Sequence, residues 1–154
     1  MNIKERREKL NITQVELAEV TGLSTRTIRR YESGNISKIK EQYILRLMDE
    51  YFKIDEEHGI LKRDDIVAAI AKLAKSYNIT LVYLFGSYAK DNANERSDVD
   101  LLIETKETGL RYFGLVEELR QTLKKKIDVI RIEELTENSE LLTSILREGI
   151  KIYE

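Results

Sequence analysis

Apolar positions in the second half of the chain follow two spacings, and together they predict an α/β domain. Short runs rich in β-branched residues predict buried strands at 79–85, 99–104 and 127–132. Apolar residues at helical spacing predict helices at about 64–77, 108–124 and 138–148. The order helix-strand-strand-helix-strand-helix predicts a small mixed sheet covered by helices.

The first half carries a different pattern, with two short helices joined by a tight turn. Thr13 and Glu16 have the spacing of a capping box at the start of the first helix. Gly22 suits the left-handed residue that ends this helix, and Ser24 can cap a second helix over 25–32. Two helices joined by a glycine-containing turn predict a helix-turn-helix in an all-α domain.

The string T-Q-V-E-L-A-E-V-T-G-L-S-T-R-T-I-R-R-Y-E-S-G, which spans both helices, resembles the Cro/C1-type (XRE) helix-turn-helix family of repressors. The resemblance implies binding to double-stranded operator DNA, in which arginine can pair with guanine. It implies DNA contacts at Gln14, Ser24, Thr25, Arg26, Arg29 and Arg30. A homodimer would read two half-sites. The alternatives are a solvated arginine-rich face and a module that docks a protein.

Apolar residues continue at helical spacing after this motif. They are Ile39, Tyr43, Ile44, Leu47, Met48 and Tyr51. Such a stripe can complete the core of the small helical domain, or it can form a dimer face. The spacing alone leaves both interpretations open.

A Gly-Ser pair and an Asp-x-Asp pair stand where two predicted strands meet loops. Gly86 and Ser87 follow the first strand, and after ten residues Asp98 and Asp100 flank the start of the next. Side chains at i and i+2 on a strand point to the same face, so these two carboxylates repel each other unless a cation lies between them. Mg²⁺ prefers such oxygen ligands, and glycine permits close backbone approach to a phosphate.

A third acid, Asp128, stands alone in the apolar run 127–132, where an unpaired charge costs free energy. The whole set resembles the nucleotidyltransferase superfamily that includes DNA polymerase beta. Within it, residues 60–154 resemble the minimal nucleotidyltransferases (MNT). Many relatives have Ala-Arg-Gly after Gly-Ser-x, where this chain has Ala-Lys-Asp; Lys90 keeps the cation, and Asp91 replaces a glycine.

The MNT resemblance implies a Mg²⁺-dependent nucleotidyltransferase with ATP as donor. It implies two Mg²⁺ ions and catalysis at Asp98, Asp100 and Asp128, and nucleotide binding at Gly86, Ser87 and Lys90. Minimal nucleotidyltransferases are paired with HEPN-domain toxins. The resemblance therefore further implies an MntA-like antitoxin that adds AMP to a HEPN partner and binds its own operator. A transcriptional regulator with an inactive nucleotidyltransferase-like domain and a small-molecule nucleotidyltransferase are the alternatives.

Composition limits the kinds of site and the cellular location that we expect for this chain. The 154 residues contain no cysteine, which excludes disulfides and thiolate metal sites and fits a reducing cytoplasm. No apolar run approaches about 18 residues, and the N-terminus has no hydrophobic signal core, so we expect a cytoplasmic protein without a membrane span. A polar stretch before Gly59 separates the two predicted domains, 1–55 and 60–154. The run 124–126 of three lysines is typical of a solvated helix end.

Overall fold

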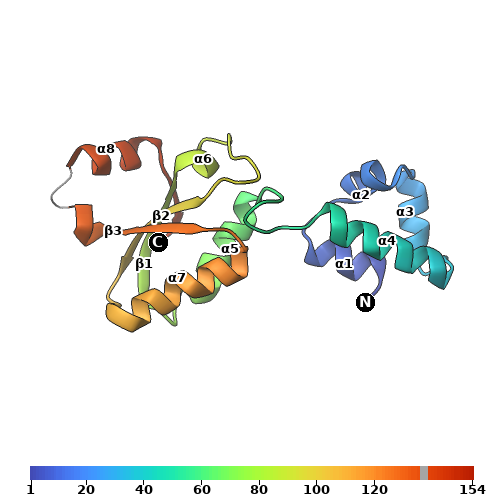
Figure 1. Ribbon diagram of the computed structural model, residues 1–154, viewed down its shortest axis with the longest axis horizontal. Coiled ribbons are helices and arrows are strands. Elements are labelled where there is room, and N and C mark those ends of the chain that lie inside the picture. The colour runs from blue at the N-terminus through green and yellow to red at the C-terminus, as the bar shows by residue number, and fades with distance from the viewer. Residues whose placement is uncertain (136–138) are drawn as a thin grey trace. The chain divides into compact units, whose positions relative to one another are not determined.

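The computed structural model describes residues 1–135 and 139–154, and the chain divides into two compact units, 1–53 and 54–154. The first unit is helical, and the second is a four-stranded mixed sheet with helices on both faces (Figure 1). This confirms the predicted fold class. No helix within the described ranges is long and apolar enough to cross a bilayer.

The first unit consists of α1 (Ile3–Lys9), α2 (Gln14–Thr21), α3 (Thr25–Glu32) and α4 (Lys38–Tyr51). The predicted capping box is present, because the Thr13 side chain accepts from the Glu16 N–H and the Glu16 carboxylate accepts from the Thr13 N–H. Gly22 ends α2 in the left-handed region, at φ 69°. Helices α2 and α3 therefore form the helix-turn-helix that the sequence predicts.

The apolar residues at helical spacing after the helix-turn-helix lie on α4, and only some of them face the core. Ile44 and Met48 are buried in the core of the first unit. Ile39, Tyr43 and Tyr51 are 82%, 63% and 70% exposed. The stripe therefore divides between the core and an apolar outer face.

In the second unit the strands lie in the order β3-β2-β1-β4. Their bounds are Ile79–Phe85 for β1, Val99–Thr105 for β2, Ile127–Arg131 for β3 and Ile150–Tyr153 for β4. Strand β1 runs antiparallel to β2 and to β4, and β2 runs parallel to β3. The pattern of apolar residues does not predict β4, because four residues after a helix carry too little periodicity and only pairing with β1 makes them a strand.

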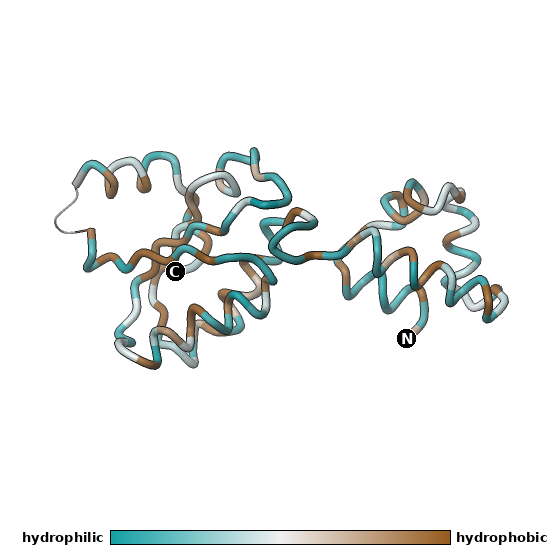
Figure 2. Tube along the Cα trace, viewed as in Figure 1, coloured by the Kyte–Doolittle hydropathy of each residue, from teal (hydrophilic) through white to brown (hydrophobic). Residues whose placement is uncertain are grey.

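The helices cover both faces of this sheet. Their bounds are Arg63–Ala74 for α5, Gly86–Ala89 for α6, Gly109–Leu123 for α7, Ile132–Leu135 for the 3₁₀ helix η1 and Ser139–Glu148 for α8. Helices α5 and α7 pack in one hydrophobic cluster with the sheet, and α8 and η1 pack in another on the opposite face (Figure 1). The strands are mostly brown in Figure 2, as expected for strands buried on both faces. Residue 138, the expected start of the last helix, lies outside the described residues.

One lysine in the predicted solvated run is buried. The Lys125 side chain is 1% exposed, and its Nζ donates to the carbonyl oxygens of His58, at 3.1 Å, and Glu95. Burial lowers the pKa of Lys125, and nearby acids, Asp55 first, oppose that shift. The ammonium therefore ties the segment that opens the second unit to the loop that leads into β2.

We expect Lys125→Met to destabilise the second unit, because it leaves two carbonyl oxygens without their charged donor. The loss should be about 2 kcal/mol of unfolding free energy, the usual range for a hydrogen bond to a charged group. Urea unfolding followed by circular dichroism measures it. Lys124→Met, which changes an exposed neighbour in the same run, is the matched control; equal losses in both variants would contradict the role given to Lys125.

Candidate active site and DNA-binding helix

Parallel pairing brings the predicted carboxylates to one end of the sheet. Asp100 on β2 is the register partner of Asp128 on β3, and on its other side Asp100 faces Phe85 at the end of β1. Asp98 precedes Asp100 by two residues, just before β2 begins. Asp100 lies two residues before Leu102 on β2, so the two side chains point to the same face of the sheet. Leu102 is buried under α8, and the acids therefore belong to the sheet face that α8 covers.

The charges of two of the acids act on the third, Asp100. The pKa of Asp100 is raised to about 6, first by burial and then by the charges of Asp128 and Asp98. Asp98 has a counterion, because its Oδ2 lies 3.8 Å from Nζ of Lys126. Lys126 belongs to the run predicted as a solvated helix end, and no residue pattern marks it as a neighbour of the acids. Asp128 is exposed.

Gly86 lies directly against this cluster. Its φ of 69° is in the left-handed region, and a Cβ built on it would come within 3.0 Å of the Cγ of Asp100 and closer still to a carboxylate oxygen. Only glycine therefore allows the chain to turn here beside the acid. The expected Gly-Ser turn is the start of the single-turn helix α6, in which Ser87 is half-buried.

Lys90, the cation predicted to bind nucleotide, follows α6 and is exposed. Its Nζ lies 3.0 Å from Oε2 of Glu148 at the end of α8. The structure thus brings Gly86 and the acids together, whereas it gives Lys90 a carboxylate partner on another element.

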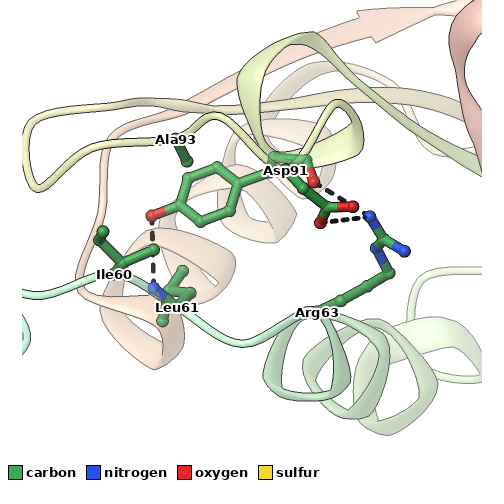
Figure 3. A pocket seen from close by; sticks show the side chains of 6 residues that line it. Ile60, Leu61, Arg63, Asp91 and Ala93 are labelled. Carbon is green, nitrogen blue, oxygen red and sulfur yellow. Dashed lines mark hydrogen bonds and ion pairs between the residues drawn. The ribbon is translucent and has the colours of Figure 1, made fainter.

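The residue that departs from the family pattern keeps the backbone that glycine would take. Asp91 has φ 55°, a left-handed conformation that aspartate tolerates better than most residues. Its Oδ1 accepts from Nη2 of Arg63 at 2.8 Å, and the same nitrogen donates to the carbonyl oxygens of Tyr88 and Ala89 (Figure 3). Arg63 therefore fixes the end of α6, at the turn where many relatives have glycine and this chain has Asp91.

A cavity of about 230 Å³ lies beside this anchor, lined by Ile60, Leu61, Arg63, Tyr88, Asp91 and Ala93 (Figure 3). The Tyr88 ring is 5% exposed, and its hydroxyl accepts from the Leu61 N–H at 3.4 Å. Because Tyr88 is buried and bonded in this way, it anchors the segment before α5 onto α6.

The donor chemistry at the sheet end fits Mg²⁺, although the side chains are not gathered into a ligand sphere. Within residues 1–135 and 139–154, no group of three or more Asp, Glu, His or Cys is close enough to hold a metal ion. Yet the charges of Asp98 and Asp128 repel that of Asp100, and Gly86 brings the backbone directly against the Asp100 carboxylate. A cation in this place would relieve that repulsion, once Asp98 had turned from Lys126.

In the first unit, α3 presents its cationic side chains to solvent. Arg26, Arg29 and Arg30 are exposed, whereas Ile28 is fully buried in the core. Ser24 caps the helix by accepting from the Thr27 N–H at 3.1 Å, and Thr25, which follows it, is half-buried. The predicted arginines therefore share an accessible helix surface.

Gln14 belongs to a network that joins three helices. Its Nε2 donates to Oε2 of Glu32 at 2.8 Å, and its Oε1 accepts from Nε of Arg29 at 3.2 Å. Glu32 also accepts from Nε of Arg7 at 2.6 Å. Burial would raise the pKa of Glu32, but the hydrogen bonds from Arg7 and Gln14 outweigh it and lower that pKa. The network orients Gln14 and Arg29 in advance of any ligand.

We expect Asp100→Asn to stabilise the protein at neutral pH when no divalent cation is present. A folded-state pKa of about 6, above the unfolded 3.8, means that stability falls as the pH rises from about 4 to about 6. The full shift would correspond to about 3 kcal/mol, and solvent screening of a half-buried group reduces this to about 1–2 kcal/mol. Urea unfolding at pH 8 should show that gain and at pH 4 almost none. Asp128→Asn, which removes one repelling charge, should gain less. A difference that did not change with pH would contradict the repulsion.

Two family descriptions match the chain. Residues 68–154 match the family "Polymerase beta, Nucleotidyltransferase", and residues 3–56 match the family "Helix-turn-helix". Two relatives from Methanocaldococcus jannaschii carry the names "Putative protein adenylyltransferase MJ0128" and "Putative protein adenylyltransferase MJ1215". The first is 36% identical over 69 residues, which is 43% of this chain and 70% of the relative. The second is 36% identical over 61 residues, 38% of this chain and 71% of the relative.

Solved structures of toxin–antitoxin assemblies are also similar. A chain from a toxin-antitoxin crystal structure with AMP-PNP has a TM-score of 0.47 and 23% identity, over 56% of this chain and 72% of that one. A chain from the complex of the tri-AMPylated Shewanella oneidensis HEPN toxin with an MNT antitoxin has a TM-score of 0.46 and 19% identity, over 60% and 72%. The family matches confirm the two resemblances drawn from the motifs: the chain belongs to the polymerase beta nucleotidyltransferase family and carries a helix-turn-helix module of the XRE type at its N-terminus.

Proposed function

We propose that this protein is a Mg²⁺-dependent adenylyltransferase that transfers AMP from ATP to a hydroxyl of a partner protein. The observation that supports this most is the meeting of Asp98, Asp100 and Asp128 beside Gly86 at one end of the sheet. The names of the two archaeal relatives support a protein as acceptor.

The three acids and the Gly-Ser pair would have different roles in the reaction. Asp98, Asp100 and Asp128 would hold Mg²⁺, which supplies charge stabilisation for the attacking and leaving oxygens when bound. The backbone at Gly86 and the donors of Ser87 would hold the triphosphate. Asp128, the exposed acid, would take the proton of the acceptor hydroxyl as it attacks the α-phosphate and pyrophosphate leaves.

Two lysines would change partners when the nucleotide binds. Lys126 now faces Asp98, and Lys90 now faces Glu148. Both pairs are solvent-exposed, and such pairs contribute little to stability, so releasing them costs about 1 kcal/mol or less. Each ammonium could then turn to a phosphate oxygen.

The acceptor is the part of the reaction for which the described residues offer least. One unit is a helix-turn-helix, and the other is the small sheet that carries the acids. Positioning supplies a large share of the rate in phosphoryl-type transfers. We therefore propose that a docked HEPN-type toxin supplies the acceptor side chain, as the MNT resemblance implies, and that the protein is its antitoxin.

We further propose that α3 reads operator DNA. The exposed Arg26, Arg29 and Arg30 would contact bases or phosphates, with Ser24 and Thr25 at the start of the helix. Gln14 would contact a phosphate from a position that Glu32 and Arg29 already hold. An antitoxin of this kind would repress its own operon.

We expect Asp98→Asn/Asp100→Asn to abolish adenylylation of the partner. Loss of two carboxylates should lower the rate at least about 100-fold, which corresponds to about 3 kcal/mol of transition-state stabilisation. Intact-mass spectrometry after incubation with ATP, Mg²⁺ and the product of the neighbouring gene measures AMP on the partner, and calorimetry measures the binding of Mg²⁺-ATP.

Asp64→Asn is the control for the loss of one carboxylate, because Asp64 is exposed on α5, which packs on the face of the sheet opposite the acids. Unchanged Mg²⁺-ATP affinity in the double variant would contradict the assignment of the acids. An unmodified partner together with normal operator binding would favour a pure regulator. AMP found only on a small molecule would favour the small-molecule nucleotidyltransferase.

We expect Arg26→Ala to relax base preference in the operator, at about 1–3 kcal/mol for each lost bidentate contact. Gln14→Ala should instead weaken all sequences to a similar degree, because a phosphate contact carries no base information. Footprinting and fluorescence anisotropy on the upstream region at fixed salt distinguish the two. Arg120→Ala, an exposed arginine of the second unit, is the control. If the intact protein protects no upstream site in footprinting, operator binding is contradicted.

A further inference from the structure

Strand β3 forms one edge of the sheet, and it carries the exposed acid Asp128 (Figure 1). On one side β3 pairs with β2, and on its other side no strand from residues 1–135 or 139–154 pairs with it. An edge strand presents backbone N–H and C=O groups to which another chain can add. The candidate active site therefore borders an unpaired strand edge.

The register of β3 determines which of its backbone groups face outward. The Val99 N–H donates to the Lys126 carbonyl oxygen at 3.0 Å, and the register partner of Val99 is Ile127. Alternate residues of a parallel strand direct their backbone groups to the same neighbour, so Lys126 and Asp128 direct theirs to β2. Ile127 and Val129, on either side of Asp128, therefore direct theirs away from the sheet.

One of these outward groups already has a partner. The Val129 carbonyl oxygen accepts from the Tyr112 hydroxyl of α7 at 3.5 Å. The Ile127 C=O and the Val129 N–H remain available, and they are the two groups that a residue opposite Asp128 would bond in a parallel strand. An antiparallel strand would exchange both bonds with one residue, and at Val129 it would compete with Tyr112. The edge therefore suits a parallel strand best.

We propose that the acceptor is an extended segment of the partner protein, paired in parallel with β3 so that its hydroxyl-bearing residue lies opposite Asp128. The N–H of that residue would donate to the Ile127 carbonyl oxygen, and its carbonyl oxygen would accept from the Val129 N–H. A peptide fits such an edge because it carries a donor and an acceptor at this spacing, which a sugar-phosphate backbone lacks. This inference rests on the proposed adenylyl transfer.

Pairing in this register would bring the acceptor hydroxyl to the acids. Register partners on neighbouring strands point to the same face, as Asp100 and Asp128 do, and neighbouring strands lie about 4.8 Å apart. The acceptor side chain would thus stand beside Asp128. Its oxygen would bond to the α-phosphorus of ATP, the bond to pyrophosphate would break, and the hydroxyl proton would pass to Asp128.

Val129→Pro in the full chain tests the pairing, because proline removes the outward N–H and no bond to β2. Transfer of AMP to the product of the neighbouring gene should slow about tenfold, whereas the Mg²⁺-ATP affinity measured by calorimetry should stay within about twofold. Val129→Ala, which shortens the same side chain and keeps the N–H, should slow transfer by no more than about threefold. Circular dichroism shows that each variant is folded.

A pair of peptides tests the register on the unchanged protein. Tandem mass spectrometry locates the AMP-bearing residue of the partner, and a labelled peptide centred on it is titrated with the full chain by fluorescence anisotropy, without nucleotide. N-methylation of the acceptor residue removes the donor to Ile127 and should weaken binding about tenfold. N-methylation of the next residue, whose N–H points away from β3, should weaken it by less than about twofold.

Transfer that is not slowed in Val129→Pro would overturn the proposal. So would a loss of Mg²⁺-ATP affinity in that variant, because it would assign Val129 to the nucleotide site. Two methylated peptides that bound equally well would also overturn the pairing, and the reverse order of affinities would contradict the parallel direction. A partner left unmodified by the wild type is a separate result, which contradicts the proposed function itself and this inference with it.

Discussion

The candidate active site depends on one constraint, the parallel pairing of β2 with β3. That pairing places Asp100 beside Asp128, so that two carboxylates of distant segments share one end of the sheet. The cost is the burial of the Asp100 carboxylate and its repulsion by Asp128 and Asp98, which together raise the pKa of Asp100. The acids lie where β1 ends. Position 86 must be glycine there, because a Cβ would clash with the Asp100 carboxylate.

The surroundings of the site hold it in place without neutralising it. Lys125 is buried and donates to two backbone carbonyl oxygens, so it fixes the loop before β2 and is not a partner of the acids. Arg63 fixes the end of α6, because it binds Asp91 and two backbone carbonyl oxygens there. Lys126 and Lys90 lie nearer the surface, in pairs that water can replace. A rigid frame around loosely paired charges is suited to taking up a cation and a polyphosphate.

The helix-turn-helix follows a similar arrangement in a separate unit. Glu32 is held by Arg7 and Gln14, and Gln14 in turn holds Arg29, so the polar network sits beneath the exposed arginines of α3. The side chains that would meet DNA are thus oriented by hydrogen bonds from other helices. Helix α4 of the same unit leaves Ile39, Tyr43 and Tyr51 exposed, away from the core of that unit.

The sequence by itself determined the fold class, the helix-turn-helix and the family, because capping residues, glycine turns and β-branched runs act locally along the chain. The helices and strands around 79–85, 99–105 and 109–123 follow from periodicity, and β4 does not, because it is a strand only through its pairing with β1. Tertiary structure alone decided which lysine is buried, which apolar residues of α4 face solvent, and that Asp91 takes a glycine's conformation by binding Arg63. Contacts between residues distant in sequence settle these matters, and no local pattern contains them.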